Sequence, residues 1–354
     1  MVKYYAESWK DLDSVWQPLL SVSDHQVLRG LSTVFDDEWL RREGERLRLQ
    51  GDCHHLYRWL TVPLGGQPVR QLRLAEAVAA IERTMATGRM REHLALLLRH
   101  LAAYSAQDCW GFFAREFEVI ILGNLLRAEA GRVEVMGLEV GAGKTHDILL
   151  HINGRPVYVE LKTLQRTNEE TDLAEANNRL LRVIDDVVQL SAGTEIQLAR
   201  IPDGEDCAEI AATLKELEIH RQTVEVKVAA GLIRYGFTES GIGIGYGSSP
   251  KAAERRVRRI LKDVAAKAVG VNHPRVLFLR RHYFDRQDVQ VTALRESLRV
   301  ETHRGLAAVV LVPNAPIRMG DEIVDEPTVL LHRTAGSGSL SAEELQVIVA
   351  AAGL

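Results

Sequence analysis

An Asn-Gly dipeptide between two runs of alternating apolar residues is the sequence feature that most restricts the fold. Residues 147–163 read DILLHINGRPVYVELKT, with Asn153 and Gly154 near the middle. A type I′ turn needs two residues that tolerate positive φ, so Asn-Gly between such runs is the strongest short-range signal for a β-hairpin. With these residues at the turn, Ile152 faces Arg155 and Ile148 faces Val159. The sequence therefore predicts a hairpin together with its register.

This register divides the side chains of the hairpin between two faces, because side chains alternate along a strand. The first face is apolar and is expected to join a core; it carries Ile148, Leu150, Val157, Val159 and Leu161. The second face is polar and carries Asp147, Tyr158, Glu160 and Lys162. Any chemistry of the hairpin is therefore expected on the second face.

Asp147 and Glu160 lie opposite each other in the predicted register, in a non-hydrogen-bonded pair with Cα atoms about 4.5 Å apart. Two opposed carboxylates repel each other, so a cation is expected between them. Mg²⁺ typically takes one or two carboxylates and completes its shell with water and phosphate oxygen. Lys162 offers the other explanation, a surface face on which its ammonium group neutralises the acids. The hairpin alone leaves both explanations open, and a bulge near Asp147 would remove the pairing.

Gly143-Lys144-Thr145 resembles the end of a phosphate-binding loop, G-x-x-x-x-G-K-[ST], and raises the rival hypothesis of a nucleotide hydrolase. The first glycine of that motif would be at position 138, which is Leu138. The motif also has to open a helix, whose amide groups face the phosphates. The residues that follow alternate and contain an Asn-Gly turn, so we do not expect a nucleotide site here.

The rest of the chain divides into three parts by pattern. Residues 1–95 have apolar residues at helical spacing and are expected to form an N-terminal helical region. From 96 to 335, strand-like and helical segments alternate, which indicates an α/β domain with a mixed sheet. The sequence GSGS at 336–339 is typical of a linker and leads to a C-terminal helix within 336–354.

Composition excludes several classes of protein. The chain has 354 residues, of which 46% are hydrophobic, so it can bury a large core. Its three cysteines, Cys53, Cys109 and Cys207, are far apart and are expected to be buried thiols, not a disulfide framework or a zinc site. No apolar run reaches the roughly 18–20 residues that cross a bilayer, and the first residues contain no signal-peptide segment. We expect a cytoplasmic protein that does not contact a membrane.

A nucleic-acid partner would need a local basic surface, because the formal net charge is −4. The segment 250–264 reads PKAAERRVRRILKDV and is expected to form an amphipathic helix. Its apolar side carries Val257, Ile260, Leu261 and Val264, and its basic side carries Lys251, Arg255, Arg258, Arg259 and Lys262. Such a basic side either contacts a phosphate backbone or is simply solvated, and the sequence leaves both interpretations open.

A long apolar segment, WGFFAREFEVIILGNLLRAEAG, precedes the hairpin and is expected to be a helix that carries two acids. Glu118 lies on the stripe of Ala114, Ile121 and Leu125, whereas Glu116 neighbours Phe112 and Ile120. A carboxylate on such a helix is costly unless it is paired. Either acid is explained by an ion pair or by a metal site, and we favour Glu118 as the acid that faces such a site.

The order of an acid-bearing helix, a strand with Asp147, a hairpin and Glu160-x-Lys162 resembles the PD-(D/E)xK nuclease superfamily. The resemblance covers residues 108–162, and it departs from the family pattern in having His146, not proline, before the aspartate. It implies a restriction-endonuclease-like fold, in which a mixed sheet is flanked by helices. It does not cover the N-terminal helical region, which is expected to recognise substrate, form a homodimer or bind a protein partner.

The resemblance also implies an activity. Asp147, Glu160 and Glu118 would bind Mg²⁺ or Mn²⁺, and Lys162 would position or help to deprotonate the attacking water and stabilise charge on the phosphate. The expected function is hydrolysis of phosphodiester bonds, with DNA as the expected substrate. The alternative is a nucleic-acid-binding or scaffold protein that keeps this fold without cleavage. The presence of all three hairpin residues argues against that alternative.

Overall fold

The chain forms two compact units, each of which has its own core. The computed structural model describes residues 5–50, 53–61, 68–88, 90–103, 109–128, 132–135, 147–163, 176, 179–184, 186–188, 193–220, 223–238, 242–246, 250–266, 273–280, 287–298, 306–312, 318–319, 322–323, 328–331 and 339–352. The larger unit contains residues 1–164, 257–283 and 290–354, and the smaller unit contains 165–256 and 284–289.

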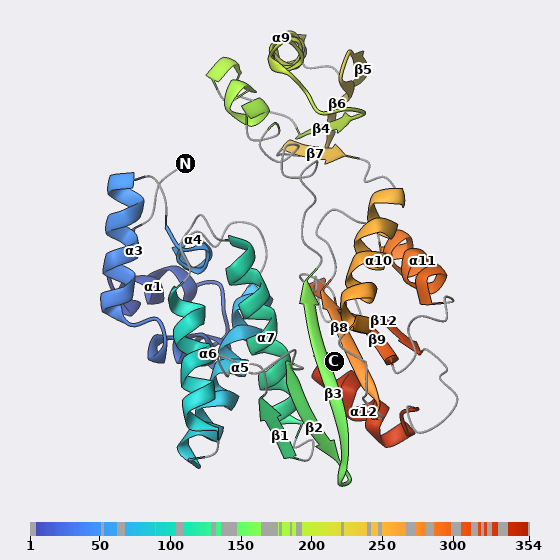
Figure 1. Cartoon of the computed structure of the whole chain (residues 1–354). Coiled ribbons are helices and arrows are strands. Elements are labelled where there is room, and N and C mark those ends of the chain that lie inside the picture. The colour runs from blue at the N-terminus through green and yellow to red at the C-terminus, as the bar shows by residue number, and fades with distance from the viewer. Residues whose placement is uncertain are drawn as a thin grey trace. The chain divides into compact units, whose positions relative to one another are not determined.

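Every element described before residue 128 is helical, as predicted (Figure 1). The helices are α1 (Trp9–Trp16), α2 (Val22–Arg29), α3 (Asp37–Gln50), α4 (His55–Thr61), α5 (Pro68–Ala86), α6 (Arg91–Ala103) and α7 (Cys109–Arg127), with a 3-10 turn, η1, at Gly30–Thr33. A capping box of Ser8 and Asp11 begins α1. Three buried indole rings cross-link the helices through their N–H groups: Trp9 donates to Phe35 O, Trp16 to Leu60 O and Trp39 to Ala102 O.

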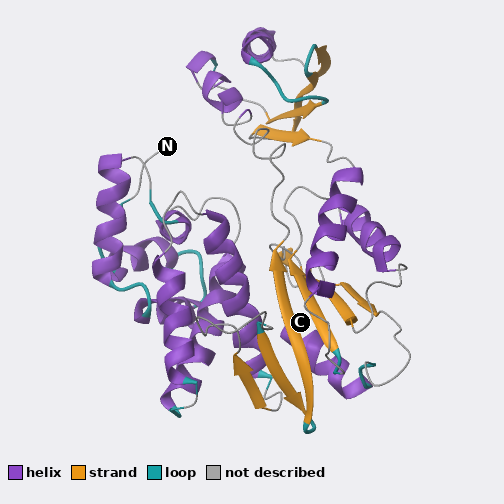
Figure 2. Cartoon of the chain, in the orientation of Figure 1, coloured by secondary structure: helices purple, strands orange, loops and turns teal. Residues whose placement is uncertain are grey.

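Among the described residues, six strands form a mixed sheet, which confirms the predicted α/β class (Figure 2). The strands are β1 (Arg132–Val135), β2 (Ile148–Ile152), β3 (Arg155–Thr163), β8 (Arg275–Arg280), β9 (Leu306–Val312) and β12 (Thr328–Leu331), in the order β1-β2-β3-β8-β9-β12. Strands β3, β8 and β9 are parallel, and the outer neighbours are antiparallel.

The predicted hairpin register is confirmed from the turn to Ile148. Strands β2 and β3 pair from Ile152–Arg155 to Ile148–Val159. Asn153 and Gly154 both have positive φ, 52° and 78°, as a type I′ turn requires. The apolar face is buried as expected at Ile148, Leu150, Val157 and Val159, while Leu161 is partly buried.

The central strands of this sheet are covered on both faces, and β8 shows how the sequence achieves this. Val276 and Phe278 belong to the core that contains α7, whereas Leu277 and Leu279 belong to a second core. The second core is formed with α10 (Pro250–Ala266) and α11 (Gln287–Leu298). Parallel strands that are buried on both faces read as continuous apolar runs, which is why RVLFLR and LAAVVLV carry no alternation.

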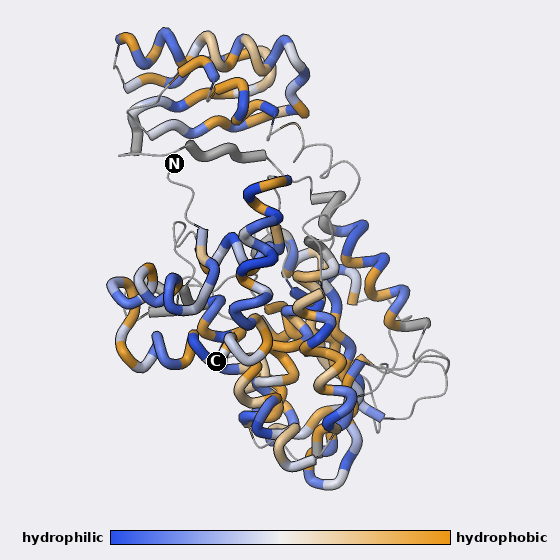
Figure 3. Tube along the Cα trace, turned by 90° about the vertical axis from the view of Figure 1, so that its left-hand side faces the viewer, coloured by the Kyte–Doolittle hydropathy of each residue, from blue (hydrophilic) through white to orange (hydrophobic). Residues whose placement is uncertain are grey.

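The N-terminal helices and the sheet share one core, so the compact units do not separate near residue 95. The cluster runs from Ala6 through the helices and the sheet to Ala352. Figure 3 colours the chain by hydropathy, with hydrophobic residues in orange. The C-terminal helix α12 (Ala342–Ala351) joins the same core, and Asn124 Nδ2 donates to Ala351 O at 3.0 Å. The boundaries expected at 95 and 335 follow changes in sequence pattern. The apolar faces of α5, α6 and α12 are nevertheless buried in the core that includes the sheet.

Most of the smaller unit comes from residues that lie between β3 and β8 in the sequence. Its sheet has the order β5-β6-β4-β7, with β4 (Gly193–Leu198), β5 (Val224–Val228), β6 (Gly231–Thr238) and β7 (Ile242–Tyr246). Helix α9 (Gly204–His220) and the helical residues 179–184 pack on it through Leu180, Ile184, Ile210 and Leu214. Strands β5 and β6 form an antiparallel hairpin that turns at 229–230.

The remaining described strands, Arg318–Met319 (β10) and Glu322–Ile323 (β11), form a short antiparallel pair. Cys53 and Cys207 are buried, as predicted, and the environment of the Cys109 side chain lies outside the described residues. Within the ranges given above, no helix is long and apolar enough to span a membrane.

We predict that Gly123→Ala destabilises the larger unit by about 2 kcal/mol, because overpacking costs roughly 1–3 kcal/mol. A Cβ atom on Gly123 of α7 would lie 2.4 Å from Ala77 Cα and 2.5 Å from Ala77 Cβ on α5, so the two helices would have to separate. Chemical denaturation measures the change. Gly30→Ala is the matched control: this glycine has helical φ and ψ and no neighbour within 4 Å of a new Cβ. Equal stability of both variants would contradict the prediction.

Candidate functional site

Asp147 lies at the point where β2 and β3 separate. The ladder ends at Ile148–Val159, and β3 continues to Thr163 beside β8. Asp147 is in a bend before β2, and its Oδ2 accepts a hydrogen bond from Leu161 N at 2.7 Å. In a continued ladder this N–H would bond to the backbone of β2, so the carboxylate replaces a backbone acceptor. The expected pairing of Asp147 with Glu160 is therefore not part of the ladder, and this part of the prediction is corrected.

Glu160 is fully buried, and two cationic side chains flank its carboxylate. Lys162 Nζ is 3.8 Å from Oε2, and Arg275 Nη2 is 3.8 Å from Oε1. The cation expected beside the acids is thus supplied at Glu160 by protein side chains. Lys162 was predicted in this role, whereas Arg275 was missed. The available signal was an arginine at the start of the wholly apolar strand 276–279, because a charge at such a position needs a buried partner.

Arg275 also connects this acid to the end of α10. Its Nη2 donates to Val264 O at 2.8 Å, which satisfies a carbonyl in the last turn of that helix. Burial lowers the pKa of the Arg275 guanidinium, and the Glu160 carboxylate opposes part of this decrease. The guanidinium group of Arg275 therefore contacts both Glu160 and the end of α10.

Glu116 is the alternative helix acid, and both of its carboxylate oxygens accept hydrogen bonds from arginine side chains. Arg70 donates from Nε at 2.6 Å and also from Nη2, and Arg280 Nη1 donates at 3.0 Å. Burial alone would raise the pKa of Glu116, but the two guanidinium groups outweigh it and hold the pKa below its usual value. This carboxylate joins α5, α7 and β8, so its role in the described structure is structural.

Aromatic rings complete this buried cluster. The guanidinium carbon of Arg70 lies 4.3 Å from the ring centroid of Trp59 and 5.0 Å from that of Phe113. Arg280 Nη1 donates to Phe113 O at 2.7 Å. Cation–π contacts of desolvated arginines are among the stronger examples of this interaction, so the rings help to keep both charges in the core.

Glu118 lies near enough to two residues of the hairpin segment, Asp147 and Lys162, for their charges to act on its carboxyl group. Its side chain is 18% exposed and forms an ion pair with Arg115 Nη1 at 2.5 Å. Burial raises the pKa of Glu118 to about 7. Arg115 and Lys162 oppose this increase, whereas the charge of Asp147 adds to it. Asp147 and Lys162 are therefore near enough to Glu118 to interact with it electrostatically. Lys162 also forms an ion pair with Glu160.

The three carboxylates of Asp147, Glu118 and Glu160 suit a hard divalent cation in their chemistry. Asp147 and Glu118 repel each other, and a cation between them would relieve this repulsion. No group of three His, Cys, Asp or Glu side chains in the described ranges is arranged to hold a metal ion. Mg²⁺ often uses only one or two protein carboxylates, so a set of three is not required. The carboxylate oxygens are of the type that Mg²⁺ takes, and the ion pairs of Glu118 and Glu160 would have to rearrange for it to bind.

Helix α10 is amphipathic as predicted. Val257, Leu261 and Val264 are buried in the second core. The basic side chains of Arg255, Arg258, Arg259 and Lys262 are exposed. Arg256, between them, is buried instead. This exposure suits both a solvated surface and a phosphate contact, and the contact stays a prediction.

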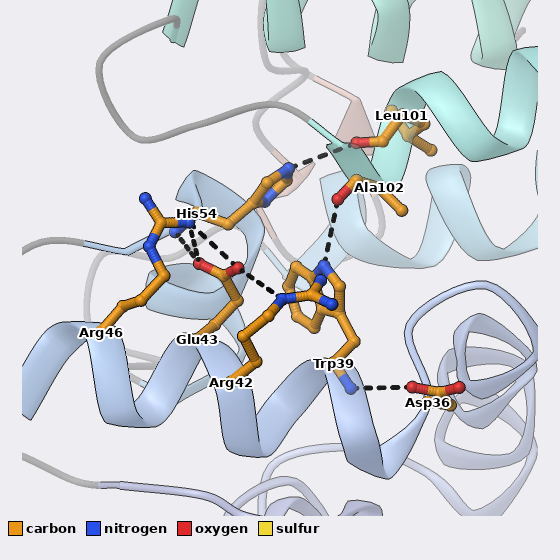
Figure 4. Close-up of polar contacts among 8 residues, drawn as sticks. All are labelled: Asp36, Trp39, Arg42, Glu43, Arg46, His54, Leu101 and Ala102. Atoms are coloured by element: carbon orange, nitrogen blue, oxygen red, sulfur yellow. Dashed lines mark hydrogen bonds and ion pairs between the residues drawn. The ribbon is translucent and has the colours of Figure 1, made fainter.

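A second polar cluster, around Glu43 and His54, is explained by packing alone (Figure 4). Glu43 is buried and accepts hydrogen bonds from His54 N at 2.9 Å and Arg46 Nη1 at 3.0 Å. The ring of His54 contacts Leu101 O through Nε2 at 3.2 Å and accepts from Leu56 N through Nδ1. Burial lowers the pKa of His54 to about 4. Both ring nitrogens have protein partners, so this histidine is structural.

The nucleotide-loop motif at Gly143-Lys144-Thr145 lies outside the described residues. The next described element, β2, is a strand and not the helix that a phosphate-binding loop requires. Comparisons of the chain with models of known protein families, with curated proteins and with solved structures found no match. The resemblance to the PD-(D/E)xK superfamily therefore stays a hypothesis based on the residues described above.

We predict that Glu116→Ala lowers the free energy of unfolding by about 3–5 kcal/mol, since removing one partner of a buried ion pair leaves uncompensated charge. Arg70 and Arg280 would both lose their carboxylate. Chemical denaturation of the variant gives the measurement, and Glu92→Ala, an exposed acid on α6, serves as the control. A loss below about 1 kcal/mol for Glu116→Ala would show that the cluster is not structural.

We also predict a pH-dependent difference between Glu118→Gln and the wild type, measured with a chelator present. The pKa of this carboxyl rises from 4.5 to about 7 on folding. The folded state therefore binds an extra proton between these values, and wild-type stability falls as pH rises through this window. At roughly 1.4 kcal/mol per pKa unit, the fall is up to about 3 kcal/mol.

Glu118→Gln cannot ionise, so it should lack this fall. Its stability relative to the wild type should rise from pH 5 to pH 8, as followed by unfolding at several pH values. A constant difference across this range would contradict the environment described for Glu118.

Proposed function

We propose that this protein is a metal-dependent nuclease that hydrolyses phosphodiester bonds of DNA. The observation that carries the proposal is the position of Glu118 on α7, where the charges of both Asp147 and Lys162 act on it. The sequence places these residues on three separate segments, and Lys162 also forms an ion pair with Glu160. Local secondary structure alone does not require Asp147 and Lys162 to lie near enough to Glu118 for their charges to act on it.

The order of elements supports a restriction-endonuclease-like fold as part of the proposal. Helix α7 carries the acid, Asp147 precedes β2, a tight turn follows, and β3 carries Glu160 and Lys162. The hairpin continues into a mixed sheet with helices packed on both faces. This is the order on which the resemblance to the PD-(D/E)xK superfamily was based.

In this proposal Asp147, Glu118 and Glu160 hold Mg²⁺ or Mn²⁺. When bound, such a metal acts as a Lewis acid and lowers the pKa of a bound water. Lys162 is the group that meets the substrate. Its side chain is 30% exposed, and at 3.8 Å its contact with Glu160 is too long for a hydrogen bond. Its ammonium donors can therefore orient the attacking water or neutralise charge on a phosphate oxygen.

The exposed basic side of α10 supplies the phosphate contacts away from the reacting group. Arg255, Arg258, Arg259 and Lys262 project from one helix whose apolar side is fixed in the core. Contacts of this kind give affinity that is independent of sequence and falls with salt. They compensate for a chain whose overall charge is −4.

A second candidate is a nucleic-acid-binding protein that keeps the fold without cleavage. It is favoured by the neutralisation of Glu160 by Lys162 and Arg275 and by the finding that no three potential metal ligands converge in the described part of the chain. In this version Asp147 ends the hairpin ladder, and the buried charges stabilise the sheet. The two candidates differ in cleavage and not in binding.

We expect the purified protein to cleave labelled DNA with Mg²⁺ or Mn²⁺ and to be inactive with a chelator. Asp147→Ala and Lys162→Ala should each lower the rate at least about 100-fold, since they remove a metal ligand and a group that acts in the transition state. Gel electrophoresis of duplex DNA, single-stranded DNA and RNA gives the measurement. Lys10→Ala, an exposed lysine on α1, is the matched control.

Two results would count against catalysis. Equal cleavage by the wild type and Lys162→Ala would indicate a contaminating nuclease. Metal-independent binding of nucleic acid with no cleavage under any condition would favour the non-catalytic candidate.

A further inference from the structure

Arg115 is an arginine beside the candidate site, and part of its guanidinium group pairs with Glu118. It lies one turn before Glu118 on α7, and its Nη1 pairs with that carboxylate. Its Nε is buried, and no hydrogen-bond acceptor for it lies among the described residues. A guanidinium is planar and presents its donors in a fixed fork. One part of this fork therefore pairs with an acid of the site, while the buried Nε has no acceptor among the described residues.

A buried donor without a partner is costly, so the pair with Glu118 leaves the Arg115 guanidinium incompletely satisfied, and the side chain is 21% exposed. Arginine forks match the oxygens of a phosphate group in geometry and charge. The acid that Arg115 holds is influenced by the charges of Asp147 and Lys162. Arg115 is thus linked through Glu118 to the residues that would face a phosphodiester.

We propose that Arg115 binds a phosphate group of the nucleic acid. Its ion pair with Glu118 prevents this binding until a divalent metal binds the Glu118 carboxylate. The inference rests on the proposed nuclease function and assigns a residue that the superfamily resemblance does not include. Arg115 and a divalent cation compete for the negative charge of Glu118. When the metal binds Glu118, the Arg115 guanidinium loses its carboxylate partner. It then pairs with a phosphate of the nucleic acid instead.

This exchange makes the binding of metal and of nucleic acid cooperative. Metal releases Arg115 for the phosphate, and phosphate removes Arg115 from Glu118, so each ligand raises the affinity for the other by the same factor. A simple ion pair between neighbouring turns of a helix would produce no such coupling. The distinction can be measured without any cleavage.

The first experiment measures Mn²⁺ binding to the full chain without nucleic acid, by titration calorimetry. Arg115→Ala should bind Mn²⁺ about two- to fivefold more tightly than the wild type, because the competing ion pair is lost. Asp147→Ala should bind it much more weakly. Arg48→Ala is the matched control, since Arg48 forms an exposed ion pair with Glu45 three residues away on α3. It should leave the affinity unchanged.

The second experiment measures binding of a short labelled DNA with and without Ca²⁺, a divalent cation that also takes oxygen ligands. Ca²⁺ should strengthen DNA binding by the wild type at least about fivefold, and this gain should fall by more than about twofold in Arg115→Ala, in which only the charge of the metal itself attracts the DNA. Glu118→Gln frees the guanidinium without metal, so it should bind DNA more tightly than the wild type in a chelator. Combining it with Arg115→Ala should abolish that increase, which separates release of Arg115 from a general loss of negative charge.

The outcomes separate the two hypotheses. If Asp147→Ala weakens Mn²⁺ binding but Arg115→Ala leaves both the Mn²⁺ affinity and the Ca²⁺ effect within about twofold of the wild type, the role of Arg115 is refuted and the nuclease proposal survives. If the wild type binds no Mn²⁺, or Asp147→Ala binds it equally well, both are refuted. If Arg115→Ala fails to fold, Glu118→Gln decides alone: unchanged DNA affinity in the chelator refutes the exchange.

Discussion

The buried carboxylate of Glu116 holds together elements that are far apart in the sequence. It lies between Arg70 of α5 and Arg280 of β8, and all three side chains are almost inaccessible to solvent. Charges in such a place are tolerated only when each has a partner with good geometry. The cluster therefore fixes the rotation of α7 about its own axis. Glu118 is two residues further on, about 200° around an α-helix, so anchoring Glu116 in the core directs Glu118 to a different side. The position of the candidate site depends on this anchor.

Sequence reasoning predicted the hairpin well because the rules involved are local. The Asn-Gly turn determines the register, and alternation assigns each side chain to a face, so every pair from Ile152–Arg155 to Ile148–Val159 could be given in advance. The same rule failed at Asp147, where a side-chain carboxylate takes the place of a backbone acceptor and ends the ladder. A carboxylate and a carbonyl compete for the same N–H group, and the pattern of apolar residues carries no information about which one wins.

Partners that are distant in the sequence were not predictable from it. The sequence pattern singled out none of Arg70, Arg275 and Arg280 as a partner of an acid. Their pairing with Glu160 and Glu116 depends on the order of strands and on the packing of α5 against α7. The division into compact units was missed for a related reason. The alternating helical and strand-like sequence pattern shows no change between β3 and β8, and only the three-dimensional contacts show that the smaller unit has a core of its own.

The balance of charge at the site bears on the choice between catalysis and binding. The carboxylates of Asp147, Glu160 and Glu118 are accompanied by the cations of Lys162, Arg275 and Arg115. Such a set is close to neutral, so the protein can fold stably around it without a metal. A divalent cation would leave an excess of about two positive charges, since Mg²⁺ carries both of its charges into the site. A phosphodiester carries one negative charge per phosphate and would be attracted mainly to the metal-bound form. The same acids that need partners in the folded chain would thus make nucleic-acid binding depend on the metal, which a purely structural arrangement of these residues does not require.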